Sequence, residues 1–371
     1  MVELAIDASR AGAGQRSGTE WYSAALIDAL VRMDARPAIT LYTRNGPIAL
    51  PASIRVAQRE VRAKRLWTHL GLSAAMLRDR PRQLFVPSHV VPLLHPRNSV
   101  VTLHDVGFLM HPDQHSTHQR RMLQLTTRWN ARVARRIIAV SGQTRDDLVH
   151  LLGVPASKVL VVHSGVDHTR FHPGSSDASA DEQVLNLHGI KRPYLLFLST
   201  VHPRKNVERL LDAFLLMHDE RFQLVIAGRT GWLADDLEAR IVIEGSTPRI
   251  VRMGYVADEL VPILYRRAAA FVLPSLYEGF GMGVLEAMAS GCPVVIADRS
   301  SLPEIAGGHA VAVNPFDVAA IADGIRAAFD PDRARHLREA GMRHAATFTW
   351  ERTARETLDV LLEAGGARGP I

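Results

Sequence analysis

Short apolar runs alternate with amphipathic stretches along most of the chain. In the first half, runs rich in β-branched residues predict strands at Glu3–Asp7, Ile39–Tyr42, Leu84–Val86, Val100–Leu103, Ile137–Val140 and Val159–Val162. In the second half, the same pattern predicts strands at Tyr194–Leu198, Leu224–Ala227, Ile250–Met253, Ala270–Leu273 and Val294–Ile296. Strands that alternate with helices form parallel βαβ units, whose helices cover both faces of the sheet. The pattern therefore predicts an α/β fold.

With 371 residues, the chain exceeds the size at which a single hydrophobic core stops growing. We expect a first Rossmann-like, doubly wound domain at 1–173 and a second at 190–349. A stretch of small and polar residues predicts a linker at 174–189, and the amphipathic stretch 350–364 predicts a terminal helix. The two domains are expected to face each other across a cleft, with ligands at the carboxyl ends of the strands.

The composition is that of an ordinary globular protein, with 47% hydrophobic and 22% charged residues. No apolar run approaches the roughly 20 residues needed to span a bilayer, and the first residues lack a signal-peptide pattern. Cys292 is the only cysteine, which excludes an intrachain disulfide and suits a reducing compartment. We therefore expect a cytoplasmic protein.

Charge is distributed unevenly, with +11 on residues 1–173 and −5 on residues 174–371. A basic first half favours an anionic substrate or the anionic inner face of a membrane, and a solvated basic surface is an equal alternative. Nucleic acid is not expected as a partner, because no zinc-ligand spacing or basic-aromatic RNA-binding motif accompanies the charge.

One basic stretch, 62–80, offers a surface for a peripheral membrane contact. It contains Trp67 and the apolar residues Leu66, Leu70 and Leu77. We favour the alternative that a helix packs this apolar stripe against the sheet.

The most informative segment is Pro274–Ala289, PSLYEGFGMGVLEAMA, which follows an apolar strand and leads into a helix. Glycines after a strand let the backbone approach a ligand closely, and the start of the next helix offers N–H groups with partial positive charge. That end suits a diphosphate. Glu278 on the loop can meet a sugar, and Glu286, one turn into the helix, can accept hydrogen bonds from ribose hydroxyls.

A second element, Ser199–Asn206 (STVHPRKN), follows strand Tyr194–Leu198 and precedes a helix. It places Arg204 and Lys205 side by side near a helix start, where the macrodipole disfavours cations. A unit charge about 4 Å from a phosphate is worth ~4 kcal/mol at an effective dielectric constant of 20. The pair can therefore neutralise a leaving diphosphate that would otherwise need a metal ion.

Together these motifs resemble those of the family-4 retaining glycosyltransferases, which have the GT-B fold. In the second half, the resemblance rests on PRKN…LLDAF, GYV and PSLYEGFGMGVLEAMASGCPVV. In the first half, it rests on VTLHDVGFLMHP, AVSGQTRDDL and VHSGVDHTRFHP. It extends from Asp7 to about Leu358. Two glutamates separated by seven residues are highly specific in combination with the upstream PRKN, and either piece alone is weaker.

The resemblance implies roles for the matching residues. Those expected to act on the sugar and the leaving group are His104, Arg204, Lys205 and Glu278. Those expected to bind the donor are Gly18, Arg204, Lys205, Tyr255, Val256, Phe280, Gly281, Met282 and Glu286. Within this set, Tyr255 and Val256 would lie near the base, Glu286 would bind the ribose, and His104 would face the sugar from the first domain. The terminal helix at 350–364 would cross back to that domain.

Members of this family transfer a glycosyl unit from a nucleotide sugar with retention at the anomeric carbon. The resemblance implies a retaining hexosyltransferase that moves a hexosyl unit, with mannosyl from GDP-mannose favoured, to a hydroxyl of a glycan or lipid-linked acceptor. Polysaccharide or glycoconjugate biosynthesis is the expected setting, in the cytoplasm or peripherally on the inner face of the membrane.

No cofactor and no metal ion are expected. His111, His115 and His118 lack a nearby fourth ligand. The segment Asp330–Asp332 has an Asp-x-Asp form that some metal-dependent transferases use, but here it is typical of a turn with a helix N-cap.

Two alternatives use the same donor-binding residues. A nucleotide-sugar 2-epimerase of the same fold needs the donor but no acceptor, and a non-catalytic sugar-nucleotide-binding module needs no reaction at all. The combination of PRKN with EGFGMGVLE favours transfer over epimerisation. A nicotinamide oxidoreductase is excluded because Gly12, Gly14 and Gly18 do not match the GxGxxG spacing.

Overall fold

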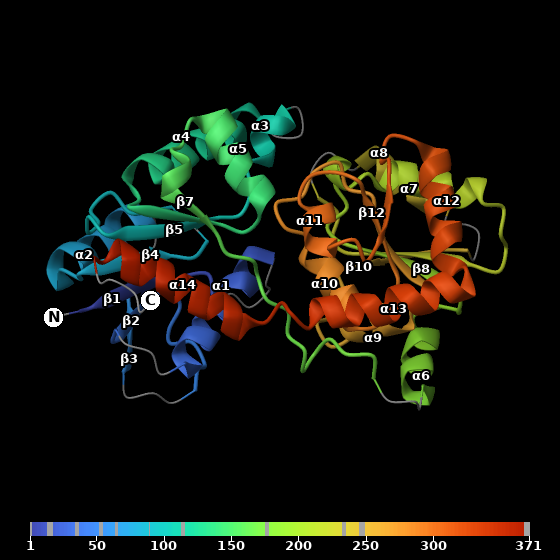
Figure 1. Cartoon of the computed structure of the whole chain (residues 1–371), viewed down its shortest axis with the longest axis horizontal. Helices are drawn as coiled ribbons and strands as arrows, with labels where there is room; N and C mark the ends of the chain where they lie inside the picture. Colours follow the sequence, from blue (N-terminus) through green and yellow to red (C-terminus); the bar gives the residue numbers. More distant parts are fainter. Residues whose placement is uncertain are drawn as a thin grey trace. The chain divides into compact units, whose positions relative to one another are not determined.

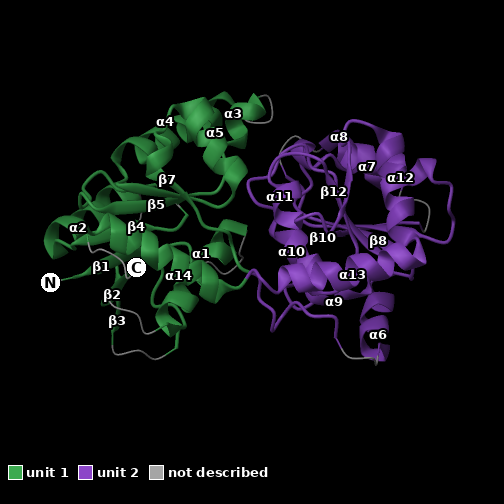
Figure 2. Ribbon diagram, viewed as in Figure 1, with its two compact units in different colours: residues 1–165, 349–371 green, residues 166–348 purple. Residues whose placement is uncertain are grey.

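The computed structural model describes residues 2–12, 18–33, 37–51, 55–63, 66–88, 90–112, 116–174, 178–231, 235–244 and 249–366. The chain divides into two compact units, unit 1 with Met1–Gly165 and Thr349–Ile371, and unit 2 with Val166–Phe348 (Figure 2). Each unit is built on one parallel sheet with helices packed against it (Figure 1). The predicted fold class of two doubly wound α/β domains is confirmed.

Unit 1 contains a seven-stranded sheet in the order β3-β2-β1-β4-β5-β6-β7. The chain builds outward from β1 in one direction and then, from β4, in the other, so the order reverses between β1 and β4. The strands are β1 Leu4–Asp7, β2 Ile39–Thr43, β3 Val56–Glu60, β4 Gln83–Val86, β5 Ser99–Leu103, β6 Arg136–Ala139 and β7 Val159–Val161. The helices are α1 Gly18–Arg32, α2 Ser73–Asp79, α3 Gly107–Met110, α4 Thr117–Val133, α5 Gly142–Leu152 and α14 Trp350–Ala364, with short helices η1 Trp67–Leu72 and η3 Ala156–Lys158.

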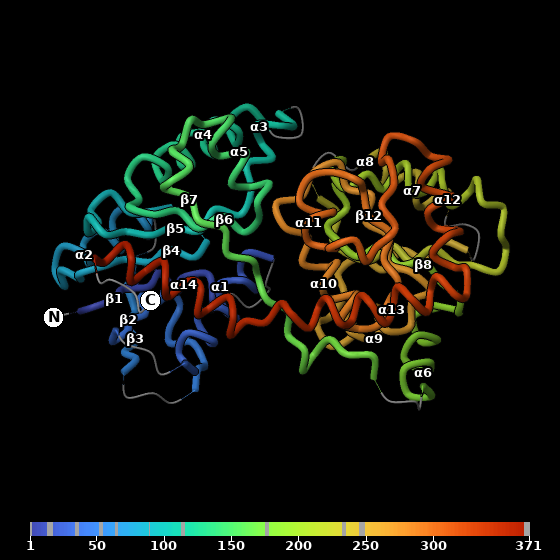
Figure 3. Tube along the Cα trace, in the orientation of Figure 1, coloured from blue at the N-terminus to red at the C-terminus, as the bar shows by residue number. Residues whose placement is uncertain are grey.

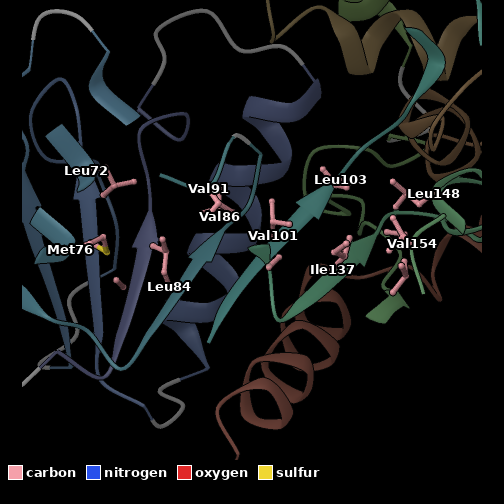
Figure 4. Close-up of a cluster of buried hydrophobic side chains, with 14 of the residues drawn as sticks. Leu72, Met76, Leu84, Val86, Val91, Val101, Leu103, Ile137, Leu148 and Val154 are labelled. Atoms are coloured by element: carbon pink, nitrogen blue, oxygen red, sulfur yellow. The ribbon is translucent and has the colours of Figure 1, made fainter. Parts of the chain in front are cut away.

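The core of unit 1 follows the two-residue period of its strands. Leu84 and Val86 project into a buried cluster with Leu72 and Met76 on one face of the sheet (Figure 4). Phe85, between them on β4, projects to the opposite face and is equally buried. Both faces are therefore covered, as in parallel sheets generally.

The terminal helix α14 belongs to unit 1, although it is separated from the rest of that unit by the whole of unit 2. It packs beside α1 and also contacts β5 and β6 (Figure 3). The rings of Trp350 on α14 and Tyr22 on α1 lie 5.8 Å apart, edge to face. Gln83 on β4 donates to the carbonyl of Leu361 at 2.7 Å. These contacts cover the face of the unit 1 sheet that lies opposite the cluster of Figure 4.

Unit 2 contains a six-stranded sheet in the order β10-β9-β8-β11-β12-β13, which repeats the winding of unit 1 and reverses between β8 and β11. The strands are β8 Tyr194–Leu198, β9 Gln223–Ala227, β10 Ile250–Gly254, β11 Ala270–Leu273, β12 Val294–Ala297 and β13 Val311–Val313. The helices are α6 Ser179–Leu187, α7 Val207–Leu216, α8 Asp235–Glu244, α9 Val261–Arg267, α10 Met282–Ala289, α11 Leu302–Ala306, α12 Val318–Phe329 and α13 Pro331–Ala345, with the short helix η4 Pro203–Lys205.

The boundary between the units differs from the expected one at 173. Residues 166–173 belong to unit 2. The expected linker at 174–189 is also wrong in part, because Ser179–Leu187 forms α6. Asp181 on α6 is buried and forms ion pairs with Arg266 and Arg267 on α9. A polar, carboxylate-rich sequence resembles a linker, but here a carboxylate attaches the helix to its unit.

Two strands were not predicted, and one apolar stripe was predicted wrongly. Strand β3 was missed because it is mostly exposed, and β13 was missed because it has only three residues. Leu66, Leu70 and Leu77 do not pack on the sheet; they are 64%, 60% and 61% exposed. The residues of this stretch that enter the core are Trp67, Leu72, Ala75 and Met76.

Candidate active site

The residues expected to bind the diphosphate lie where the strand order of unit 2 reverses. Strands β8 and β11 are parallel neighbours, so their carboxyl ends meet at one edge of the sheet. The loop after β8 carries Arg204 and Lys205, and the loop after β11 carries Glu278. The two loops are joined through the backbone, because the N–H of Leu276 donates to the carbonyl of Arg204 at 2.9 Å. Ligands of doubly wound sheets bind at this position.

The two cations lie on a short turn before the helix, not on the first turn of the helix itself. His202 caps η4 by accepting from the N–H of Arg204 through Nδ1 at 3.2 Å. Asn206 follows in the left-handed region, at φ +59°, and α7 starts after it. The buried amide of Asn206 donates to the carbonyls of Pro274 and Pro315 at 3.0 and 2.7 Å. This asparagine therefore attaches the cation-bearing turn to the loop after β11.

Lys205 and Glu278 form a nearly buried ion pair. The ammonium of Lys205 donates to Oε1 of Glu278 at 2.6 Å, and the exposed fractions of the two side chains are 14% and 8%. The hydroxyl of Ser275 donates to the same oxygen at 2.7 Å. Arg204 lies 3.9 Å from Oε2 of Glu278 and donates to the carbonyl of Tyr277 at 3.0 Å. The predicted cation pair and the predicted loop carboxylate therefore meet.

Glu278 is held as a carboxylate. Burial alone would raise its pKa, but the charges of Lys205 and Arg204 and the hydrogen bonds from Lys205 and Ser275 outweigh burial and leave the pKa below its usual value. An ionised carboxylate is a hydrogen-bond acceptor only. Glu278 is thus suited to accept from sugar hydroxyls. An ammonium has three N–H donors, so Lys205 can hold Glu278 and also contact a phosphate oxygen.

The start of α10 is shaped by glycine and two serines. Gly281 adopts φ +96°, and a Cβ there would lie 2.8 Å from a methyl of Leu302. The hydroxyl of Ser301 donates to the carbonyls of Glu278 and Phe280 at 3.0 and 2.9 Å. The helix then begins at Met282. The N–H of Val284 donates to the carbonyl of Gly281 at 2.9 Å. The first turn of a helix carries partial positive charge, which suits an anion.

Glu286 lies one turn into α10 and is half-buried. Its Oε2 accepts a hydrogen bond from the hydroxyl of Tyr265 on α9 at 3.2 Å. Burial raises the pKa of Glu286 to about 7, against the opposing effects of the Arg170 charge and the Tyr265 hydrogen bond. Near neutral pH this carboxyl group therefore titrates, whereas Glu278 stays ionised.

Tyr255 and Val256 follow β10, at the edge of the same sheet. Tyr255 is half exposed, with the guanidinium of Arg229 4.6 Å from its ring centroid, and Val256 is buried. Both line a pocket of about 610 Å³ between α6, β10 and α9. An apolar pocket with an aromatic wall is suited to a planar ring such as a nucleobase.

The other two expected residues, His104 and Gly18, lie in unit 1. His104 follows β5, and its Nε2 lies 3.0 Å from the carbonyl oxygen of Pro87. Its ring packs edge to face on Tyr22, with centroids 4.7 Å apart. Burial lowers the pKa of His104, which favours the neutral imidazole. Gly18 is exposed and is the first residue of α1.

Several residues at this site were not expected from the sequence. Ser275, Ser300 and Ser301 contact the Glu278 loop, and Tyr265 and Arg170 act on Glu286. Serines before or after a strand are common, so they carry no specific signal. Tyr265 and Arg170 lie far from Glu286 in the sequence and reach it only through the packing of unit 2.

Among the described residues, no three or more His, Cys, Asp or Glu side chains form a group that could hold a metal ion. His115 lies outside the described residues. Asp330 is the N-cap of α13 and accepts from the N–H of Arg333 at 2.9 Å, as expected.

Comparison with known proteins places these features in one group. Residues 16–170 match the family model described as Glycosyltransferase Family 4, and residues 192–330 match the one described as Glycosyl transferases group 1. O-antigen chain mannosyltransferase B of Escherichia coli is 32% identical over 268 residues, which cover 70% of this chain and 69% of that protein. Mannosylfructose-phosphate synthase of Agrobacterium fabrum is 29% identical over 235 residues, covering 60% of this chain and 51% of that protein.

Solved structures share the fold over nearly the whole chain. Sucrose-phosphate synthase of Thermosynechococcus elongatus superposes with a TM-score of 0.78 at 20% identity, covering 99% of this chain and 100% of that one. WaaG, a glycosyltransferase involved in lipopolysaccharide biosynthesis, superposes with a TM-score of 0.71 at 14% identity, covering 97% of this chain and 99% of that one. Taken with the mannosyltransferase relative, these matches show that the chain belongs to the family 4, group 1 glycosyltransferases with the GT-B fold.

Proposed function

We propose that this glycosyltransferase moves a mannosyl unit from GDP-mannose to a hydroxyl of a glycan or lipid-linked acceptor, with retention at the anomeric carbon. The observation that carries the proposal is the Lys205–Glu278 ion pair beside Arg204 and the start of α10. The O-antigen mannosyltransferase relative supports mannose as the transferred sugar and a glycan as the acceptor.

In the proposed reaction, the bond between the anomeric carbon and the diphosphate oxygen breaks while the acceptor oxygen bonds to the same face of that carbon. The acceptor proton passes to the leaving phosphate. Arg204, Lys205 and the start of α10 stabilise the developing diphosphate charge, which is the main demand of such a step. Glu278 holds hydroxyls of the mannosyl unit and Glu286 those of the ribose, with the base beside Tyr255 and Val256. In unit 1, His104 is proposed to face the sugar and Gly18 to bind the donor.

The proposal is tested by incubating the protein with GDP-mannose and a mannose-terminated glycan in EDTA. We expect an α-linked mannosyl product by NMR, because GDP-mannose carries its sugar in α linkage and the reaction retains that configuration. We expect the product to form in EDTA, because two cations replace a metal ion at the diphosphate. A β-linked product would contradict retention. Loss of activity in EDTA that a divalent ion restores would contradict a metal-free site. Transfer from UDP- or dTDP-sugars alone would contradict GDP-mannose, and a 2-epimerised sugar with no transfer would favour the epimerase.

We also propose a peripheral membrane contact, with α4 of unit 1 as its surface. This helix contains four arginines and no Asp or Glu. Met122 and Leu125 are 51% and 66% exposed, and Arg121 and Arg128 are exposed beside them at helical spacing. A helix face with exposed apolar and basic side chains suits an anionic bilayer surface. Among the described residues, no helix is both long and apolar enough to span a bilayer.

Flotation with phosphatidylcholine vesicles, with and without phosphatidylglycerol, tests this contact. We expect binding only to the anionic vesicles, and loss of binding when Arg121 and Arg128 are both replaced by glutamate. The matched double change of Arg338 and Arg343 to glutamate, on α13 of unit 2, should leave binding intact. Equal flotation of both double variants would remove α4 from the proposal.

A further inference from the structure

Tyr265 lies inside unit 2, with an exposed fraction of 0%, and still reaches the carboxyl group of Glu286. Its ring packs edge-on against Phe171 and Phe271, with centroids 6.0 and 5.2 Å away. Rings that are enclosed in this way have a single accessible rotamer, so the hydroxyl is held at a fixed point. It donates to Oε2 of Glu286 at 3.2 Å.

We infer that Tyr265 is a positioning residue for donor binding, whose hydroxyl occupies Oε2 of Glu286 and directs Oε1 to the ribose hydroxyls. The inference rests on the proposed function, because it takes Glu286 as the residue that binds the ribose. Tyr265 itself, being buried, contacts no substrate and acts only through Glu286.

Gly283 on α10 supports this geometry independently. A Cβ at this position would lie 2.9 Å from the Tyr265 hydroxyl oxygen and 3.3 Å from Cζ of Phe271. Any larger residue would therefore displace the phenol from the helix. The approach of Tyr265 therefore accounts for the third glycine of GFGMG.

The hydrogen bond of Glu286 is sensitive to pH because burial raises the pKa of this carboxyl group to about 7, and two charged groups that face it adjust that value. Arg170 attracts the carboxylate and Asp258 repels it, and the two are joined because Nη2 of Arg170 donates to the carbonyl of Asp258 at 2.7 Å. The carboxylate form accepts from ribose hydroxyls, and the Tyr265 hydroxyl favours that form. Removing the hydroxyl therefore raises the pKa of Glu286 above about 7 and weakens donor binding most near neutral pH.

The test is the pH dependence of GDP-mannose affinity, measured by calorimetry from pH 6 to 9, in which the diphosphate diester of this probe does not titrate. We expect wild-type affinity to fall as pH falls through about 7. In Tyr265→Phe, the fall should begin at higher pH and weaken binding at pH 7 by about five- to tenfold, with little change at pH 9. In Glu286→Gln, this pH dependence should disappear.

Tyr194→Phe is the matched control. Tyr194 is also fully buried, and its hydroxyl donates to the carbonyl of Leu264 on the same helix as Tyr265, at 2.7 Å. It should keep the wild-type pH profile. If Tyr265→Phe does not fold, Gly283→Ala is the second test, because it displaces the phenol while the side chains of Tyr265 and Glu286 are both kept. It should shift the pH dependence of GDP-mannose affinity in the same direction.

The outcomes separate this inference from the proposed function. A wild-type protein that does not bind GDP-mannose at any pH contradicts the proposed donor and this inference with it. Binding that depends on Glu286 but has the same pH profile in wild type, Tyr265→Phe and Gly283→Ala contradicts the role of Tyr265 alone.

Discussion

Replacing Lys205 with alanine should reduce the release of GDP from GDP-mannose, in the presence of a mannose-terminated acceptor, by about 10²- to 10³-fold. The ammonium is the closest cation to Glu278, at 2.6 Å, and is only 14% exposed, so water cannot replace it at full strength. The expected loss is in kcat, because the diphosphate gains negative charge as the glycosidic bond breaks.

The fold should survive this change. Glu278 keeps the hydroxyl of Ser275 at 2.7 Å and the guanidinium of Arg204 at 3.9 Å, so its carboxylate is not left without compensation. Circular dichroism of the variant should match the wild type. Lys191→Ala, an exposed lysine of the same unit, should retain full turnover. Turnover at the wild-type level in Lys205→Ala would refute the assignment of this lysine to the diphosphate.

Replacing Gly228 with alanine should destabilise unit 2 by about 3 kcal/mol or more, which corresponds to a fall of roughly 10 °C in its thermal midpoint. Gly228 follows β9 at φ +124°, and a Cβ there would lie 1.9 Å from the carbonyl oxygen of Ser199. A backbone oxygen cannot move without disrupting the loop after β8, which leads to Arg204 and Lys205.

Gly254→Ala separates this clash from the cost of a left-handed backbone. Gly254 ends β10 at φ +67°, but a Cβ there would have no heavy atom within 4 Å. Its replacement should therefore cost only about 1 kcal/mol. Calorimetric unfolding of both variants measures the difference, and equal midpoints would show that the contact with Ser199 does not limit this position.

The site in unit 2 could be predicted where its residues are neighbours in the sequence. Arg204 and Lys205 form an unusual adjacent pair, and the glycines around Glu278 follow a strongly apolar strand. Because β8 and β11 flank the reversal of strand order, their loops meet, as doubly wound folds require. The structure adds that Lys205 pairs with Glu278 directly, which neither motif indicates by itself.

The features that the sequence did not indicate depend on contacts between distant segments. Arg170 influences Glu286 because residues 166–173 belong to unit 2, whereas the polar stretch that predicted a linker at 174–189 placed them in the first domain. Tyr265 reads as an ordinary core residue of α9, and only packing directs its hydroxyl to α10. In unit 1, the spacing of Leu66, Leu70 and Leu77 suggested a buried stripe, but all three side chains are exposed. Leu66 precedes η1 in the left-handed region, Leu70 lies on the π-helix η1 and Leu77 on α2, so the three do not share one regular helix.

Amide hydrogen exchange with and without GDP-mannose tests the central claim most directly, because it locates the diphosphate on the chain. If the two loops of unit 2 bind it, nucleotide should slow exchange at the start of α10, from Phe280 to Val284, and at the turn that contains Arg204 and Lys205. Saturating GDP-mannose that slows exchange elsewhere and leaves both segments unchanged would contradict the account.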